Sequence, residues 1–185
     1  MYCIIAWMES PLVPGQSAPA FTLLDLQGQP YSLPGAPGKV VVLNFWSAEC
    51  PGSARVDQEI QPFLARWGSR VAWWLVASNA NEPPDLLLQA AQERAARERG
   101  AGPVLHDPHN RVADLYGAQT TPHLFVIDTQ GILRYQGSFD DVTFRRRIAT
   151  RGYVVEAVEA LLAARQPEIS EVPACGCAII REEAG

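Results

Sequence analysis

The hydrophobic pattern of the chain alternates between short apolar runs and segments with helical spacing. Val40–Trp46 is a largely apolar run that begins with three β-branched valines, which is typical of a buried strand, and residues 71–78 form a second apolar run. After Cys50 the apolar side chains recur every three or four residues as far as Trp67, which indicates an amphipathic helix. The pattern therefore predicts a central strand followed directly by a helix, with Cys50 at the junction.

The other segments continue this alternation. Two short alternating runs within residues 15–33 flank a Gln-Gly turn signal and predict a hairpin. Helices are predicted over 85–99, 111–116 and 153–164, and strands over 123–127 and 132–137. Strands and helices that alternate and end in a hairpin and a helix are typical of an α/β sandwich.

The length of 185 residues allows one domain with a full core and a short appendage. We place the domain at residues 15–165. Residues 1–14 form a lead-in whose apolar residues either add an edge strand or pack loosely on the domain. Residues 166–185 form a tail that contains a Cys-x-Cys motif.

The charge pattern excludes several classes of partner. Charged residues make up 19% of the chain and the net charge is −5, so there is no basic surface for nucleic acid and no basic amphipathic helix for a membrane. No run approaches the roughly 18 apolar residues of a membrane span.

The apolar start, residues 1–8, is too short for a signal peptide and lacks a basic region, so we expect a cytoplasmic protein, an exported form being the alternative. Four cysteines are too few for a disulfide scaffold.

The segment F-W-S-A-E-C-P-G-S around Cys50 resembles the active-site segment of the thioredoxin-like superfamily, in which a C-x-x-C motif opens a helix after a strand. The resemblance extends over residues 15–162 and is strongest to the redoxin (AhpC/TSA) family of the TlpA and ResA type. It implies a thioredoxin-like three-layer sandwich, with a mixed central β-sheet, helices on both faces and an N-terminal β-hairpin. Ser53 replaces the second cysteine, so the motif is C-x-x-S and holds no dithiol.

We predict that Cys50 is the reactive residue. A helix N-terminus favours a thiolate and lowers the thiol pKa, whereas the neighbouring Glu49 opposes ionisation. The resemblance implies that Trp46, Pro51 and Gly52 face the substrate. The alternative is a buried, inert cysteine.

Two polar residues bear on what Cys50 can do. Ser53 lies one helical turn after Cys50, where its hydroxyl can donate to a thiolate or mixed disulfide, or simply satisfy backbone groups at the helix start. Asn44 stands where thioredoxins often carry a buried acid, and an amide cannot act as that base. Both substitutions point away from an efficient dithiol cycle within the motif.

Thr121 and Pro122 form the second landmark of the resemblance. In thioredoxin-like proteins a cis proline begins the strand that faces the reactive cysteine, and the preceding residue exposes its backbone to the substrate. A cis X-Pro bond costs only about 0.5–1 kcal/mol relative to trans. The alternative is a trans proline in a loop. His123 follows directly and is a candidate to face the site, but a lone histidine of this kind is more often structural.

The tail holds Cys175 and Cys177 in the ending V-P-A-C-G-C-A-I-I, which resembles the Gly-Cys-x-Ile ending of one redoxin subgroup. In a flexible segment these thiols are candidate resolving cysteines for an oxidised Cys50. A metal clip is an alternative, but two ligands do not make a zinc site. The third possibility is an ordered tail with packed cysteines. Cys3 has no role that we can assign.

Other polar clusters suggest no further chemistry. His106, Asp107 and His109 have ligand-type side chains, but with Pro108 they fit a solvated turn better than a metal site. The arginines at 145–147 fit an exposed surface. We therefore predict neither a metal nor a cofactor.

The resemblance favours a thiol-disulfide oxidoreductase-like redox protein that acts through Cys50 by mixed-disulfide chemistry. Its partner would be a disulfide-bearing protein or a low-molecular-weight thiol such as glutathione. One alternative is a peroxiredoxin-like thiol peroxidase, for which Ser47 matches the expected hydroxyl but Leu43 stands in place of a proline. Another is a non-catalytic binding or sensing module. The sequence predicts no oligomeric state.

Overall fold

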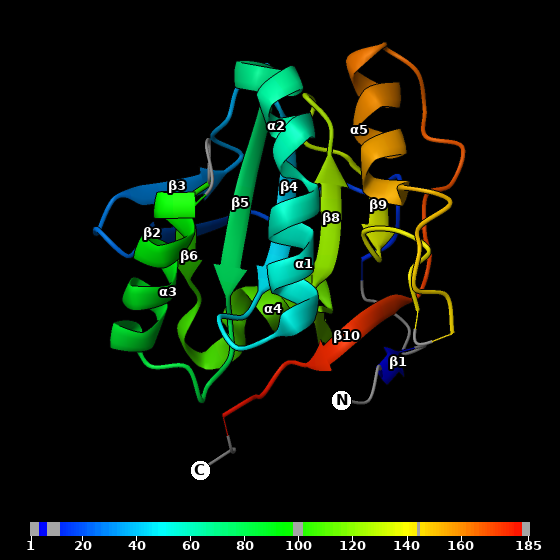
Figure 1. Cartoon of the computed structure of the whole chain (residues 1–185). Coiled ribbons are helices and arrows are strands. Elements are labelled where there is room, and N and C mark those ends of the chain that lie inside the picture. The colour runs from blue at the N-terminus through cyan, green and yellow to red at the C-terminus, as the bar shows by residue number, and fades with distance from the viewer. Residues whose placement is uncertain (1–3, 7–11, 98–101, 144, 183–185) are drawn as a thin grey trace.

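A seven-stranded mixed sheet forms the centre of the molecule (Figure 1). The structure is a computed structural model that describes residues 4–6, 12–97, 102–143 and 145–182. The strands β4, β5 and β6 run parallel, and the other neighbours pair antiparallel. The spatial order is β3 (Pro30–Leu33), β2 (Phe21–Asp25), β6 (Val104–His106), β5 (Val71–Ala77), β4 (Val40–Trp46), β8 (His123–Ile127) and β9 (Leu133–Gly137).

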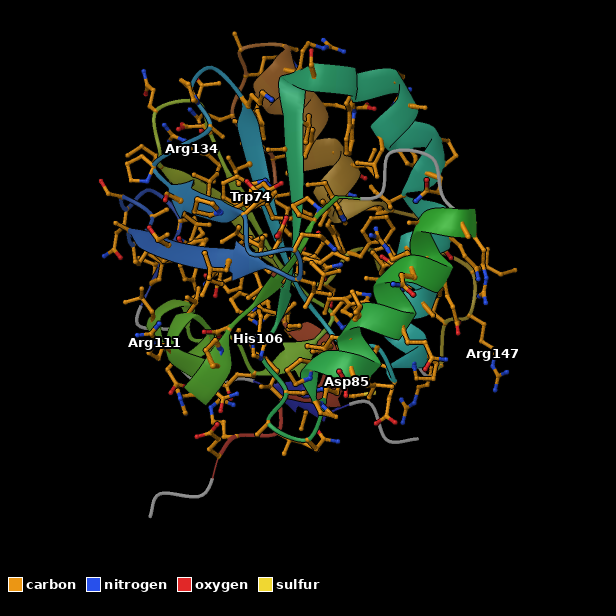
Figure 2. All side chains as sticks on the ribbon, turned by 90° about the vertical axis from the view of Figure 1, so that its left-hand side faces the viewer. Trp74, Asp85, His106, Arg111, Arg134 and Arg147 are labelled. Atoms are coloured by element: carbon orange, nitrogen blue, oxygen red, sulfur yellow. The ribbon has the colours of Figure 1, made fainter. Side chains whose placement is uncertain are left out.

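Helices cover both faces of this sheet. One face carries α1 (Pro51–Glu59), α2 (Gln61–Trp67), α3 (Pro84–Arg97) and α5 (Tyr153–Leu162), and the other carries α4 (Arg111–Tyr116). Figure 2 shows this division, with Asp85 of α3 and Arg111 of α4 on opposite sides of the sheet. The predicted three-layer sandwich is thus confirmed, with β2 and β3 as the N-terminal hairpin. None of the helices in the described ranges is long and apolar enough to cross a membrane.

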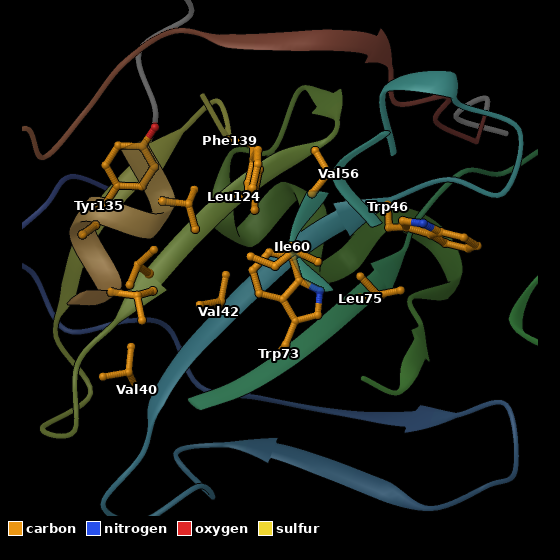
Figure 3. Close-up of a cluster of buried hydrophobic side chains, with 14 of the residues drawn as sticks. Val40, Val42, Trp46, Val56, Ile60, Trp73, Leu75, Leu124, Tyr135 and Phe139 are labelled. Carbon is orange, nitrogen blue, oxygen red and sulfur yellow. The ribbon is translucent and has the colours of Figure 1, made fainter. Parts of the chain in front are cut away.

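The strand β4 is buried along its whole length, and its side chains alternate between two cores. On one side Val42 and Trp46 pack with Val56 of α1 and with Ile60, the C-cap residue of that helix (Figure 3). On the other side Phe45 packs with the aromatic rings of α4 and β8. Full burial of such a side chain contributes about 1.5–3 kcal/mol each. This double burial fixes the end of β4, from which the next helix starts.

The amphipathic segment after Cys50 is divided into two helices rather than one. The break falls at Ile60, and Pro62 lies at the start of α2. A proline in a helix interior removes a backbone hydrogen bond and clashes with the carbonyl four residues earlier, so a new helix begins there. A short 3₁₀ helix, η1 (Gly68–Arg70), then leads the chain directly into β5 of the sheet.

The two ends of the described chain meet in a second, three-stranded sheet of order β1 (Ile4–Ala6), β10 (Ala174–Ala178) and β7 (Thr120–Thr121). The lead-in does supply an edge strand. The tail is an ordered strand and not a flexible segment, because antiparallel neighbours pair with it on both sides. In Figure 1, β10 crosses beneath the end of the sheet from which α1 begins. The tail therefore forms part of the surroundings of Cys50.

Candidate active site around Cys50

Cys50 lies at the junction predicted from the sequence. It is the N-cap residue of α1, with extended backbone angles, and its carbonyl accepts the first helical hydrogen bond from the Ala54 N–H at 3.1 Å. The residue is only 3% exposed. As a thiol it donates to the carbonyl oxygen of Thr121, with an Sγ–O distance of 2.9 Å.

The Thr121–Pro122 peptide bond is cis and lies directly beside Cys50. Gly52 completes this contact, because a β-carbon on it would lie 3.0 Å from Cδ of Pro122 and 3.4 Å from Sγ of Cys50. The structure thus brings together four of the predicted site residues, namely Cys50, Gly52, Thr121 and Pro122. Pro51, the first residue of α1, is exposed beside them.

The tail contributes a second sulfur. Sγ of Cys177 lies 3.0 Å from Sγ of Cys50, which exceeds the about 2.03–2.05 Å of a disulfide bond, so both thiols are free. Strand pairing causes this approach, because Cys177 lies opposite Thr121 in the β10–β7 register. The other tail candidate is not available, since the sulfur of Cys175 is already in a disulfide. Cys3 lies outside the described residues.

The two facing thiols differ in acidity. Burial acts to raise the pKa of Cys50, but hydrogen bonds from the Cys177 thiol and from backbone N–H groups, including that of Ser53, outweigh it and lower this pKa. Burial, the hydrogen bond to Cys50 and the nearby charges of Cys50 and Glu82 raise the pKa of Cys177 to about 12. The pair therefore ionises at Cys50 first and keeps its proton on Cys177.

Ser53 contributes through its backbone more than its side chain. Its N–H reaches the sulfur of Cys50, as expected of a helix N-terminus. Its buried hydroxyl accepts a hydrogen bond from the N–H of Ser47 at 3.3 Å. The hydroxyl thus satisfies a backbone N–H of the turn before α1 and does not cap the helix, and no contact among the described residues joins it to the Cys50 sulfur.

A buried carboxylate, Glu82, holds the turn that leads into Cys50. Its Oε1 accepts from the Ser47 hydroxyl at 2.5 Å, and its carboxylate also accepts from the N–H groups of Ala48 and Glu49, each at 3.3 Å. Glu82 was not among the residues predicted from the sequence. A signal was present, since Glu82 follows β5, the parallel neighbour of β4, and the loops after parallel neighbours lie at the same edge of a sheet.

Trp46, which we predicted to face the substrate, is mostly buried but lines a surface cavity together with Ser47 and Arg94, so its contact with a substrate stays a prediction. The residue is 3% exposed and belongs to the core. Its indole N–H donates to Oδ2 of Asp57 at 2.8 Å. Asp57 is paired in turn with Arg94 of α3, at an Nε–Oδ1 distance of 3.1 Å. Trp46 therefore joins the strand before Cys50 to two helices.

Asn44 is fully buried beneath the same region. Neither atom of its amide group has a hydrogen-bond partner among the described residues. It supplies no base to the site, and it leaves polar atoms unpaired in the core.

His123 is structural. It is 7% exposed, and its ring packs against Phe125 with 4.5 Å between ring centroids. Burial lowers its pKa to about 3, so the ring is neutral at physiological pH. The neutral Nδ1 accepts from the Gln119 N–H at 3.4 Å.

The predicted turn at 106–110 is also structural, but Asp107 is buried and not solvated. Its carboxylate accepts from the Ser78 hydroxyl and from the N–H groups of Val112 and Ala113, and so it stabilises the start of α4. Among the described residues, no group of three or more His, Cys, Asp or Glu side chains is placed to hold a metal ion. The arginines at 145–147 are exposed.

The chain is similar to known proteins in sequence and in fold. The AhpC/TSA family pattern matches residues 14–136, which is more than half of the chain. The thiol-disulfide oxidoreductase ResA of Halalkalibacterium halodurans is 31% identical over 117 residues, which cover 63% of this chain and 64% of ResA, less than two thirds of its length.

Two solved structures are similar in fold. A conserved protein from Geobacillus kaustophilus superposes with a TM-score of 0.85 at 24% identity, over 100% of this chain and 99% of that one. The thiol:disulfide interchange protein DsbE from Chlorobium tepidum superposes with a TM-score of 0.60 at 24% identity, over 83% and 97% of the two chains. With the family match, these comparisons show that the chain belongs to the AhpC/TSA family and has its thioredoxin-like fold.

Proposed function

We propose that this protein is a thiol-disulfide oxidoreductase in which Cys50 is the nucleophile and Cys177 supplies the second thiol that the C-x-x-S motif lacks. The 3.0 Å distance between the two sulfur atoms carries this proposal. The relatives named as thiol-disulfide oxidoreductases support the same reaction class. The lowered pKa of Cys50 supports its assignment as the attacking thiolate.

The reaction follows from the two protonation states. The Cys50 thiolate attacks one sulfur of a partner disulfide, that S–S bond breaks, and the departing thiolate takes a proton from water. Cys177 then loses its proton and attacks the Cys50 sulfur of the mixed disulfide, which releases the second partner thiol. The two protein thiols are oxidised to one disulfide, and the partner disulfide is reduced to two thiols.

The partner is a disulfide-bearing molecule, and the two classes expected from the sequence are a protein and glutathione disulfide. An external thiol of the same classes restores the reduced protein through the reverse exchange. The cytoplasmic location stays a prediction.

The test is a disulfide map of protein with Cys50 and Cys177 reduced, after treatment with oxidised glutathione. We expect the wild type to form a Cys50–Cys177 bond. Cys177→Ser should keep glutathione on Cys50, because nothing resolves the mixed disulfide, and Cys50→Ser should form neither product. Ala178→Ser is the matched control, because Ala178 is the next residue of the same strand and is exposed. It should behave as the wild type.

Two results would contradict the proposal in different ways. Stable glutathione on Cys50 of the wild type would make the protein a monothiol enzyme and remove Cys177 from the mechanism. An unmodified Cys50 would remove the redox function and favour a binding module. The peroxidase alternative has less support, because the Ser47 hydroxyl donates to Glu82.

A further inference from the structure

We infer that β10 fills the strand-binding edge beside Cys50 and so restricts the disulfides that reach this sulfur to low-molecular-weight ones. This inference rests on the proposed function and names its substrate class. It concerns the backbone of the tail, whereas the proposed function concerns only the Cys177 side chain.

The edge of β7 is the place where a polypeptide would bind beside Cys50. A strand edge presents backbone N–H and C=O groups that an extended peptide can pair with. Here those groups lie at Thr120 and Thr121, and the carbonyl of Thr121 contacts the Cys50 sulfur. Ala178 and Cys177 of β10 already pair with these two residues, in antiparallel register. A polypeptide substrate would need the same backbone positions.

The fit of β10 over this edge is too close for a second chain to enter. A β-carbon on Gly176 would lie 2.2 Å from the carbonyl oxygen of Thr121 and 3.0 Å from the nitrogen of Pro122. Both neighbours are backbone atoms, so they cannot move aside as a flexible side chain would. Gly176 therefore lets β10 lie directly on the Thr121–Pro122 bond.

The strand is also held at both of its sides. Its far edge pairs with β1, and beyond its end the N–H of Ile179 donates to the carbonyl of Gln119 at 3.0 Å. Arg181 then donates to Asp114 at 2.8 Å and to the carbonyl of Ala118 at 2.7 Å. A strand attached to the same chain competes at a high effective concentration, so an external peptide has to displace all of these contacts.

The route left to the sulfur is narrow. Cys50 is 3% exposed. Gly52 lies beside its sulfur, is partly exposed, and has no side chain that could block access to it. A compact disulfide such as oxidised glutathione needs only a short approach at Gly52, without strand pairing. A folded or extended polypeptide disulfide reaches Cys50 only from the small population in which β10 has left β7.

The test measures the first exchange at Cys50 in a Cys177→Ser background, so that resolution does not enter the rate. The two probes are oxidised glutathione and disulfide-bonded insulin, followed by mass spectrometry of Cys50. We expect glutathione to react at least ~100-fold faster per disulfide than insulin, because only the open population admits insulin. Adding Gly176→Ala should lower this ratio by about tenfold, because the added methyl group pushes β10 off the edge.

Two further variants keep the test sharp. Gly152→Ala is the matched glycine control, because its new β-carbon would meet only an ordinary contact at 3.5 Å from Val155, and it should leave the ratio unchanged. Arg181→Ala releases the end of the tail without touching either sulfur, and it should lower the ratio even if Gly176→Ala fails to fold.

The outcomes separate this inference from the proposed function. Comparable rates with glutathione and insulin in the Cys177→Ser protein, or a ratio that neither Gly176→Ala nor Arg181→Ala changes, would overturn the gating role of β10 and leave the redox function intact. Failure of Cys50 to react with glutathione at all would overturn both.

Discussion

The sulfur atoms of Cys50 and Cys177 lie 3.0 Å apart although 127 residues separate them in the chain. One begins the helix after the central strand, and the other lies in β10 near the end of the described chain. When Cys50 is ionised, the Cys177 thiol donates a hydrogen bond to its thiolate, and this is the main reason that the pKa of Cys50 falls despite burial. The acidity of Cys50 therefore depends in part on a residue that lies 127 positions away in the sequence.

Replacement of Cys177 by alanine should raise the pKa of Cys50, because the strongest hydrogen bond to its thiolate is lost while the burial remains. The midpoint of Cys50 alkylation by iodoacetamide should then move to higher pH, and the rate at neutral pH should fall. Ala178→Ser should leave the profile in place. An unchanged or lower midpoint in Cys177→Ala would contradict the hydrogen bond.

The buried pair of Asp57 and Arg94 should be essential to stability. Both side chains are 5% exposed, and Arg94→Met would leave the carboxylate of Asp57 without its cation. Removal of one partner from a buried pair costs about 3–5 kcal/mol in the free energy of unfolding. The matched control is Arg97→Met, whose exposed pair with Glu93 contributes about 0–1 kcal/mol. Urea unfolding of both variants checks this prediction, and equal losses would refute it.

Asn44→Leu should stabilise the protein. Both polar atoms of this buried amide lack a partner among the described residues, and each unpaired buried group costs about 1–3 kcal/mol. Removing them should raise the free energy of unfolding by about 1–2 kcal/mol after strain from the larger side chain. Asn44→Asp should do the opposite at neutral pH, because it buries a charge. A destabilised Asn44→Leu protein would indicate that the amide has an unseen partner.

Acid should destabilise the fold through His123. Burial lowers its pKa to about 3, whereas the unfolded chain takes up the proton near the ordinary value of 6.5. Between these values only the unfolded state is protonated, so stability is full above pH 6.5 and falls as the pH drops, by up to about 1.4 kcal/mol per pH unit. His123→Phe should flatten this part of the stability profile in urea unfolding. A profile equally steep in His123→Phe would assign the acid sensitivity to other groups.

Elements with a strong local pattern were predictable from the sequence. The strand Val40–Trp46, the helix Arg111–Tyr116 and the strand His123–Ile127 lie where the hydrophobic spacing places them, because burial on one or both faces determines each. The other predicted boundaries differ by one or two residues, except where Pro62 divides the helix after Cys50, and the predicted end of the helix at 85–99 lies outside the described residues. The short strand Val104–His106 was not predicted. The tail strand has no such pattern, since its pairing depends on β1 and β7, which are remote in sequence.

The candidate site was predictable only in part for the same reason. Cys50, Gly52 and the Thr121–Pro122 bond carry a recognisable local motif. Glu82 carries none, and its importance follows only from the parallel pairing of β4 with β5. The choice between Cys175 and Cys177 required the strand register, because the two residues differ by only two positions in one short segment.

The long separation of Cys50 and Cys177 also determines how folding and oxidation influence each other. A bond between these sulfurs would close a loop of 127 residues, and in the chain-entropy model such a loop stabilises the native state by about 5 kcal/mol when the chain has no other cross-link. Because Cys175 is already in a disulfide, this figure is an upper bound for the present chain. Linkage makes the effect reciprocal, so the folded chain holds the bond against reduction by at most roughly 100 mV in reduction potential. A C-x-x-C motif encloses only a few residues and gains much less. The melting temperature of this protein should therefore rise when Cys50 and Cys177 form a disulfide and fall when that bond is reduced.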